Sequence, residues 1–399
     1  MQSKINKLIA LIVVVLYALS IAGCGGSTEP PATVPENGED FPGAVPSLIT
    51  VATYEVDAAG YVATSAMGEH LRKEEGVTIR LIPQGTDLGR LAPVRGGTVD
   101  YAHSGGGLYW TTLGLFESAD PSWGPQPLRL VAFAIAKAGG AFLTSDPENI
   151  KKIEDVKGKR IGAVVGGFGI NQATEAMLAT GDLTWDDLVV IEYPSYSDMH
   201  RGFLAGELDV TYVNTMTPTV REIEASRIGI HYVELPPPDD EEAWARCSAV
   251  APYFFGMYLT LGAGLSEENP ISGLGMPYPI FVTYPQQDKS KAYHMARLVY
   301  ENVEGYKDLH PTLESYALDP EKLTCTGFPW HDGAIEYFKE KGVWTEELEA
   351  YNQAALKQQE DLALLWEEAL DKASAEKISS KDFPEFWTEK VNQYLEQQK

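Results

Sequence analysis

Residues 153–179, IEDVKGKRIGAVVGGFGINQATEAMLA, carry a clear pattern of strand, turn and helix. They contain a short apolar run at 161–165, a glycine-rich turn at 166–169 and a segment at 171–179 whose apolar residues recur at helical spacing. A short buried strand that leads through a turn into a helix is the repeating unit of a parallel sheet covered by helices. The stretch therefore predicts an α/β fold.

The same alternation of strand and helix patterns continues on both sides of this stretch. Apolar runs typical of buried strands lie at 48–52, 77–82, 99–102, 128–136, 188–193, 207–213 and 278–284. Helical patterns lie at 61–73, 198–205, 218–226, 291–306 and 334–341, and a longer one runs from 345 to 372. The long helix carries an apolar stripe that either docks on the rest of the protein or contacts a partner.

The N-terminus carries the features of an export signal. Two lysines precede an apolar run at 8–21 that is too short to span a bilayer comfortably, and small residues then lead to Cys24. This order resembles a bacterial lipoprotein signal, in which residues 1–23 are removed and Cys24 is lipidated. The alternatives are an ordinary signal peptide or a membrane helix with a chance cysteine. Residues 24–46 are expected to form a flexible tether, so the chain would work outside the cytoplasm as a membrane-anchored lipoprotein.

The composition limits the partners that the chain can bind. It has 57 acidic and 31 basic residues among 399, which gives a formal net charge of −26. So acidic a protein is not expected to bind nucleic acid or anionic lipid surfaces, because both require cationic patches. Aligned backbone N–H groups would still allow it to hold a small anion. Cys247 and Cys325 either form a disulfide bond or are two buried thiols.

The sequence contains no evident catalytic motif. Its seven histidines are scattered without metal-ligand spacing, and it has no Gly-x-Ser-x-Gly elbow. The turn at 166–169 is not a phosphate loop, because no Gly-Lys-Ser/Thr follows it. We therefore expect a binding protein rather than an enzyme, with no metal and no cofactor.

The segments 48–61, 84–102, 153–169 and 331–342 are informative in combination. They contain a Gly-Tyr pair, a Gln-Gly-Thr tripeptide, the strand and glycine turn quoted above, and the sequence HDGAIEYFKEKG. In this order and spacing they resemble the TAXI-type solute receptors of TRAP transporters, and the resemblance extends over about 48–342.

The resemblance implies a periplasmic binding protein fold of type II, in which two α/β lobes are joined by a two-strand hinge. Lobe one would comprise 48–141 and 252–342, lobe two would comprise 142–251, and residues 343–399 would form a C-terminal helical extension outside the resemblance. Such receptors bind a small organic solute, an amino acid such as glutamate or an organic acid, and deliver it to TRAP membrane subunits, commonly a fused permease. The alternative is the ligand-binding protein of an ABC importer or of a sensory system with the same fold.

The candidate binding site lies where the predicted strands end, because ligands of open α/β sheets bind outside the carboxyl ends of the strands. The loops at those ends are 53–61, 84–88, 103–107, 166–171 and 214–218. The candidate ligand-binding residues in or beside these loops are Tyr54, Glu55, Asp57, Tyr61, Thr86, Arg90, Ser104, Gly167, Phe168, Gly169, Asn171, Asn214 and Thr215.

These residues offer both charges to a ligand. The helix start after the glycine turn and the guanidinium of Arg90 can each hold a carboxylate. Glu55 and Asp57 would favour an ammonium group and repel a second carboxylate, so we hypothesise that the solute carries a positive group, as an amino acid does. In the simpler alternatives Arg90 is exposed, Thr86 and Ser104 cap helices, the glycines form an ordinary turn and the aromatic residues belong to the core.

Overall fold

A computed structural model describes residues 41–398 of the chain except 55, 57, 166 and 325. The chain forms two separate units, 1–43 and 44–399, and the folded structure below is that of the second unit. Several predictions lie outside the described residues: the signal at 1–23, the tether up to residue 40, and the roles of Cys24, Glu55, Asp57 and Cys325.

The first sheet contains five strands, β1 (Leu48–Thr53), β2 (Thr78–Pro83), β3 (Tyr101–Ser104), β4 (Arg129–Phe133) and β11 (Ile280–Thr283). Their order is β2-β1-β3-β11-β4, with β1 parallel to β2 and β3 and with β11 antiparallel to both of its neighbours. Consecutive residues of β1 are buried, as expected for a strand whose sheet is covered on both faces. The helices of this half are α2 (Ala59–Glu74), α3 (Asp87–Arg95), α4 (Leu108–Thr112), α9 (Lys289–Glu301), α10 (Val303–Tyr306) and α11 (Asp332–Glu340).

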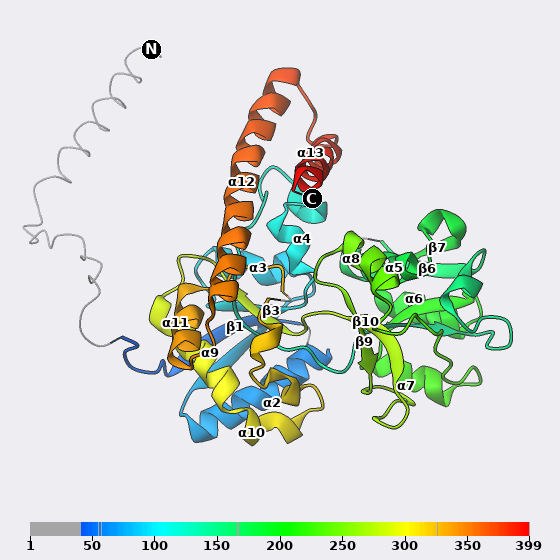
Figure 1. Cartoon of the computed structure of the whole chain (residues 1–399), viewed down its shortest axis with the longest axis horizontal. Coiled ribbons are helices and arrows are strands. Elements are labelled where there is room, and N and C mark those ends of the chain that lie inside the picture. Colours follow the sequence, from blue (N-terminus) through cyan, green and yellow to red (C-terminus); the bar gives the residue numbers. More distant parts are fainter. Residues whose placement is uncertain (1–40, 55, 57, 166, 325, 399) are drawn as a thin grey trace, which may run out of the picture. The chain divides into compact units, whose positions relative to one another are not determined.

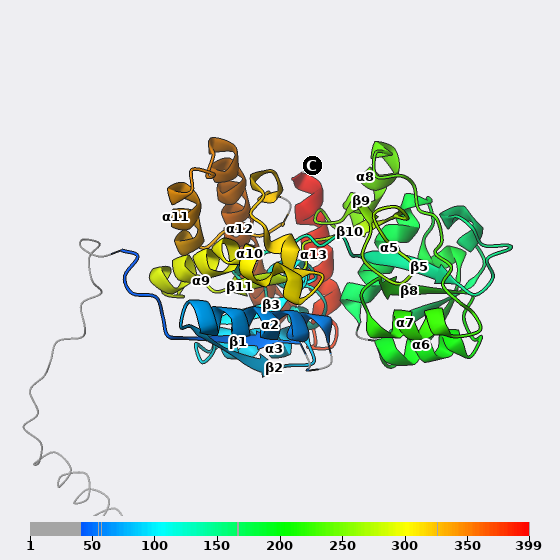
Figure 2. The same ribbon diagram turned by 90° about the horizontal axis from the view of Figure 1, so that it is seen from below.

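The second sheet contains six strands, β5 (Gly140–Thr144), β6 (Arg160–Val164), β7 (Val189–Tyr193), β8 (Val210–Asn214), β9 (Phe255–Leu259) and β10 (Ile271–Gly275). Their order is β7-β6-β8-β5-β10-β9. The helices of this half are α5 (Phe168–Thr180), α6 (Tyr196–Leu204), α7 (Pro218–Ala225) and α8 (Glu241–Val250). Figure 2 shows α5 and α8 on one face of this sheet and α6 and α7 on the other.

The two sheets have similar topologies. In the first sheet β11 pairs antiparallel with β3, and in the second sheet β5 pairs antiparallel with β8. Each of these two strands is the first that the chain forms after it leaves the other sheet. The chain therefore passes twice between the sheets, through 134–139 and 276–279. This exchange of strands is the arrangement expected of a type II periplasmic binding protein, so the predicted fold class is confirmed.

The division into lobes at 141 and 251 stays a prediction. Strands β9 and β10, which follow residue 251, hydrogen-bond within the second sheet. Local boundaries agree with the sequence patterns to within a few residues, with one correction: the helix expected over 291–306 is divided at Asn302 into α9 and α10. Short 3-10 turns occur at η1 (Phe116–Ala119), η2 (Ile153–Val156), η3 (Trp185–Asp187), η4 (Lys307–Leu309), η5 (Leu313–Tyr316) and η6 (Pro320–Lys322).

The C-terminal extension is a pair of helices, α12 (Glu346–Glu376) and α13 (Phe383–Gln397), which lie side by side (Figure 1). Thr345 caps the N-terminus of α12 by accepting a hydrogen bond from Leu348 N. Three glutamates in the first turn also stabilise the helix, because their negative charges interact favourably with the positive end of its dipole. The apolar stripe of α12 docks on the protein itself, since Leu348, Leu362 and Trp366 are buried. Gln359 of the same helix donates to the Leu128 carbonyl at 3.1 Å. In the part of the chain that the structure describes, no helix has the length and apolar character needed to cross a membrane.

The side chain that fixes α13 is Trp387. It is fully buried, its ring lies 4.8 Å from that of Trp366 in α12, and its indole N–H donates to the Leu113 carbonyl at 3.1 Å. The extension is thus part of the core of the first half.

We predict that Trp387→Ala lowers the free energy of unfolding by about 3–5 kcal/mol, because it leaves a large cavity and an unpaired carbonyl. Leu364→Ala, on the same extension but 61% exposed, should change it by less than about 0.5 kcal/mol. Urea denaturation of the two variants and the parent protein measures both effects. Equal stability of the two variants would show that the extension does not dock in this way.

Candidate functional site

The two segments that connect the sheets run side by side. Ala134 N donates to the Pro279 carbonyl at 2.9 Å, and Tyr278 N donates to the Ala134 carbonyl at 2.8 Å. These bonds join segment 134–139 to segment 276–279 at the point where the chain leaves one sheet for the other. The connection is the two-strand hinge that the predicted fold requires.

A cavity of about 640 Å³ lies between the sheets and against both connecting segments. Its lining includes loops that follow β1, β2 and β3 in the first half and β6 and β8 in the second, together with 253–254. These loops follow the carboxyl ends of parallel strands, where open α/β sheets bind ligands. The aromatic residues of the lining are Tyr54, Tyr196, Tyr212, Tyr253, Phe254 and Tyr278.

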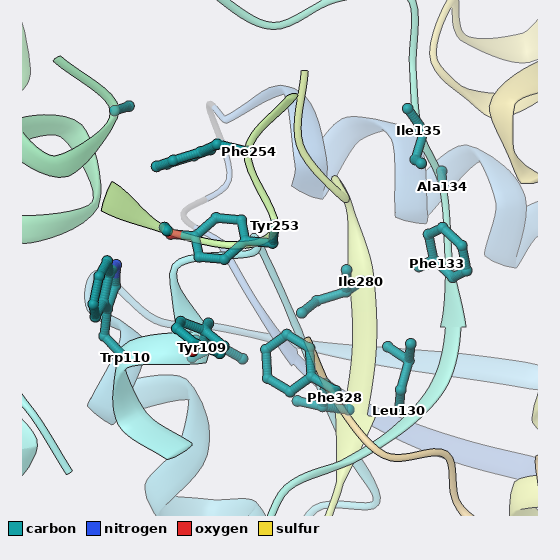
Figure 3. Close-up of a cluster of buried hydrophobic side chains, with 14 of the residues drawn as sticks. Tyr109, Trp110, Leu130, Phe133, Ala134, Ile135, Tyr253, Phe254, Ile280 and Phe328 are labelled. Atoms are coloured by element: carbon teal, nitrogen blue, oxygen red, sulfur yellow. The ribbon is translucent and has the colours of Figure 1, made fainter. Parts of the chain in front are cut away.

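Close packing around the cavity depends on the glycines after β3. A Cβ atom on Gly106 would lie 2.9 Å from the ring of Tyr253, and one on Gly105 would lie 3.3 Å from that of Tyr278. Tyr253 in turn packs beside Tyr109 and Trp110 of α4, with 5.4 Å between the ring centroids of Tyr253 and Tyr109 (Figure 3). The glycines therefore allow aromatic side chains from distant parts of the chain to meet at the cavity wall.

Arg90 is buried at the edge of the cavity, with 5% of its surface exposed. Its guanidinium donates to Asp87 Oδ1 at 2.5 Å, to Ser104 Oγ at 3.2 Å and to the Gln84 carbonyl at 3.2 Å. It also lies over the ring of Tyr54, with Cζ 4.3 Å from the ring centroid. The alternative in which Arg90 is exposed on its helix is therefore wrong, and its charge is already paired within the protein.

A buried histidine lies beneath this wall. His103 Nδ1 is 2.9 Å from Thr53 Oγ1 and 3.2 Å from Thr64 Oγ1, and the ring meets Tyr54 edge to face with 5.8 Å between centroids. Burial, and to a smaller extent the nearby charge of Arg90, lower the pKa of His103 to about 3. His103 is therefore neutral at neutral pH and acts as a polar support for the cavity wall.

The glycine turn before α5 also reaches the cavity, through Gly167 and Gly169. Asn171 fixes this turn, because its amide accepts from Val164 N at 3.0 Å and donates to the Val164 carbonyl at 2.8 Å. The amide of Asn171 is thus satisfied by its own loop. Phe168 begins α5, and the structure does not describe its side chain.

The predicted site residues divide into those that line the cavity and those that do not. Tyr54, Thr86, Arg90, Gly167, Gly169 and Asn214 line it, and their binding roles stay predictions. Thr86 also accepts from Gly89 N at 3.0 Å, so it caps α3 as the simpler alternative proposed.

The remaining predicted residues, Tyr61, Ser104, Asn171 and Thr215, are not part of the cavity lining. Ser104 is buried and donates to Asp87 Oδ1 at 2.7 Å, rather than capping a helix. Thr215 is also buried and accepts from Gly139 N at 3.3 Å. These two hydroxyls therefore support the neighbouring backbone or the Arg90–Asp87 pair.

Several residues that line the cavity were not among the predicted site residues. Asp87 and Glu117 carry charge, and Tyr196, Tyr253 and Tyr278 contribute aromatic surface. Asp87 is adjacent to the Gln-Gly-Thr tripeptide and its position could have indicated a role. Glu117 and Tyr253 have no local signal, because they reach the cavity only through the three-dimensional fold.

The described residues show no group of three or more histidine, cysteine, aspartate or glutamate side chains placed to hold a metal ion. Cys247 is buried in α8, and burial raises the pKa of its thiol to about 12. Cys325 lies outside the described residues, so its pairing with Cys247 stays a prediction.

The fold and the cavity define an α/β protein of the type II periplasmic binding class. The model of the NMT1-like family matches residues 114–342, more than half of the chain. The chain therefore belongs to the NMT1-like family. Comparison with curated proteins gives no match.

Solved structures with similar folds include named binding proteins. The alkanesulfonate-binding protein SsuA from Xanthomonas axonopodis pv. citri, bound to MOPS, is 12% identical over 76% of this chain and 96% of that chain, with a TM-score of 0.40. The periplasmic aliphatic sulphonate binding protein SsuA from Escherichia coli is 12% identical over 84% and 94%, with a TM-score of 0.39. Substrate binding domain 2 of Lactococcus lactis GlnP, in an open conformation, is 12% identical over 68% and 96%, with a TM-score of 0.37.

The low pKa of His103 predicts a pH dependence of stability. Between pH 6.5 and about 3 the unfolded chain takes up a proton at this residue that the folded chain does not, so stability falls as the pH is lowered through this range. The contribution of one such group has a slope of about 1.4 kcal/mol per pH unit. Urea denaturation at pH 6.5, 5.5 and 5.0 should therefore show a shallower dependence for His103→Gln than for the parent. Identical slopes would mean that His103 is not held neutral in the folded protein.

Proposed function

We propose that this protein is an extracytoplasmic solute receptor, which binds a small organic molecule in the cavity between its two sheets. The single observation that carries the proposal is the cavity of about 640 Å³ at the junction of both sheets and both connecting segments. Its size is typical of sites that enclose a small organic ligand, and its lining is mostly apolar with a few polar groups.

The geometry suits capture and release rather than bond-making. A solute in this cavity contacts loops from both halves, so it can favour a closed arrangement if it binds that arrangement better than the open one. The paired connecting segments would act as the hinge for such a change. The lining is rich in aromatic residues and glycines, and His103 is not part of it and is a weak base, because its pKa is lowered to about 3.

We further propose which transport system the receptor serves. The four segments that resemble TAXI-type receptors favour delivery of the solute to TRAP membrane subunits, with Cys24 as the lipidated anchor and 24–46 as the tether. The same cavity would also serve an ABC importer or a sensory system. Membership in the NMT1-like family agrees with a receptor role that is not restricted to one of these systems.

A screen of purified protein against amino acids, amines and organic acids tests the receptor role. A solute present at 100 times its dissociation constant should stabilise the folded protein by about 2.7 kcal/mol, which raises the midpoint of thermal unfolding measurably. Failure of every small solute to raise the midpoint would contradict the proposal.

Gly169 offers a direct test of where the solute binds. It lines the cavity, and a Cβ atom built on it would have no heavy atom within 4 Å among the described residues. Gly169→Phe should therefore fold normally but fill part of the cavity and weaken binding of the screened solute by about tenfold or more. Gly169→Ala, which adds one methyl group, is the matched control and should retain binding. Calorimetric titration measures the affinity of both variants for the solute. Unchanged binding by Gly169→Phe would show that the solute binds outside this cavity.

A further inference from the structure

We propose that the solute is an organic cation, in which a positively charged nitrogen is carried on an apolar or aromatic body. The inference rests on the proposed function, since it specifies the ligand of the same cavity. It extends the hypothesis of a positively charged group, which rested on Glu55 and Asp57, to a solute without a carboxylate, and it departs from the organic acids that the family resemblance implies. Three features carry it: the balance of charge in the wall, the bonding of each charged group, and the aromatic surface.

The charged side chains of the cavity lining are Asp87, Arg90 and Glu117, as far as the structure describes it. The charge of the only cation among these three is already paired, because Arg90 bonds to Asp87, to the Ser104 hydroxyl and to a backbone carbonyl, and stacks on a tyrosine ring. An incoming carboxylate would approach the guanidinium beside Asp87, whose negative charge would repel it. Arg90 therefore holds the wall together rather than offering a vacant anion site.

The carboxylates of Asp87 and Glu117 have oxygen atoms that accept no hydrogen bond from another described residue. Both bonds to Asp87, from Arg90 and Ser104, end on Oδ1, and no hydrogen bond from the described residues reaches Oδ2. Glu117 makes no ion pair and no side-chain hydrogen bond with any other described residue. Glu117 is exposed to solvent, and the partial desolvation of its carboxyl group, together with the nearby carboxylate of Asp87, raises its pKa. A bound cation would stabilise the charged form of both carboxylates.

The sum of the charges in the cavity lining favours a bound cation over a bound anion. The lining contains two carboxylates and one guanidinium, so its formal charge is −1, although the exposed position of Glu117 lets solvent screen part of it. The start of α5, at Gly167 and Gly169, contributes the partial positive charge of a helix N-terminus, roughly half of an elementary charge. The backbone N–H of Gly167 is moreover already bonded to the Val164 carbonyl. The helix start is thus too weak to reverse the sign of the site.

The aromatic walls suit the body of such a ligand. Rings attract a cation through their π faces, and the contact of Arg90 with Tyr54 shows that this wall already holds one positive group in that way. Tyr196, Tyr253 and Tyr278 extend the aromatic surface around a volume of about 640 Å³. A compact dicarboxylate would fill little of this volume and would leave the rings without a partner.

Calorimetric titration with two probes of the same ring system tests the proposal. Tryptamine carries an ammonium group, and indole-3-propionate carries a carboxylate on a chain of similar length. We expect tryptamine to bind at least about tenfold more tightly, because the excess charge in the cavity wall attracts the first and repels the second. Equal or tighter binding of indole-3-propionate would overturn the proposal.

The variant Glu117→Gln removes the excess charge with little change in shape. It should reduce the preference for tryptamine about tenfold and leave the affinity for indole-3-propionate equal or higher. Glu368→Gln, an exposed carboxylate on α12, is the matched control and should change neither affinity. A loss of affinity for both probes to the same extent in Glu117→Gln would also contradict the proposed role of its charge.

The outcomes separate this inference from the proposed function. If the solute screen identifies a ligand that Gly169→Phe excludes, but that ligand is an anion, the protein is a receptor and the cation proposal is wrong. If neither indole probe binds while the screen finds no organic cation, the cation proposal is again wrong. If no solute of any charge binds, the receptor function itself fails.

Discussion

The hydrogen bonds between the two connecting segments are the constraint on which the structure depends. The chain crosses from the first sheet to the second and later returns beside its own path, and the first strand after each crossing, β5 or β11, pairs antiparallel with β8 or β3. The first sheet is therefore assembled from two segments, 48–133 and 280–283, whereas the continuous segment 140–275 forms the second sheet. The crossing also places the carboxyl ends of parallel strands from both sheets around one cavity, and so the location of the candidate site follows from the topology.

Much of the fold could be predicted from the sequence, because its strands and helices have strong local patterns. The apolar run at 48–52 corresponds to β1, and the pattern at 218–226 corresponds to α7. The elements that the patterns did not reveal include α4, β5, α8, β9, β10 and α13. Strands β9 and β10 lack a clear alternation: two of the five residues in β10 are glycines, which carry no pattern of side chains.

The site was less predictable, because its chemistry depends on contacts between residues that are distant in sequence. Arg90 was recognised as a candidate cation, but only the fold shows that Asp87 and Ser104 already neutralise and orient it. Asn171 was a reasonable ligand contact by position, yet its amide closes its own loop. Glu117, which lies in a short turn after α4, gives no signal in the sequence and still determines the excess charge of the cavity.

The central claim is that two halves joined by a paired hinge close on a solute held between them. It is tested most directly by the distance between spin labels on Ala92 of α3 and Glu222 of α7, two exposed positions in different halves. We expect saturation with the solute found in the screen to shift the distance distribution to a single, changed maximum. A distribution that is the same with and without bound solute would contradict it.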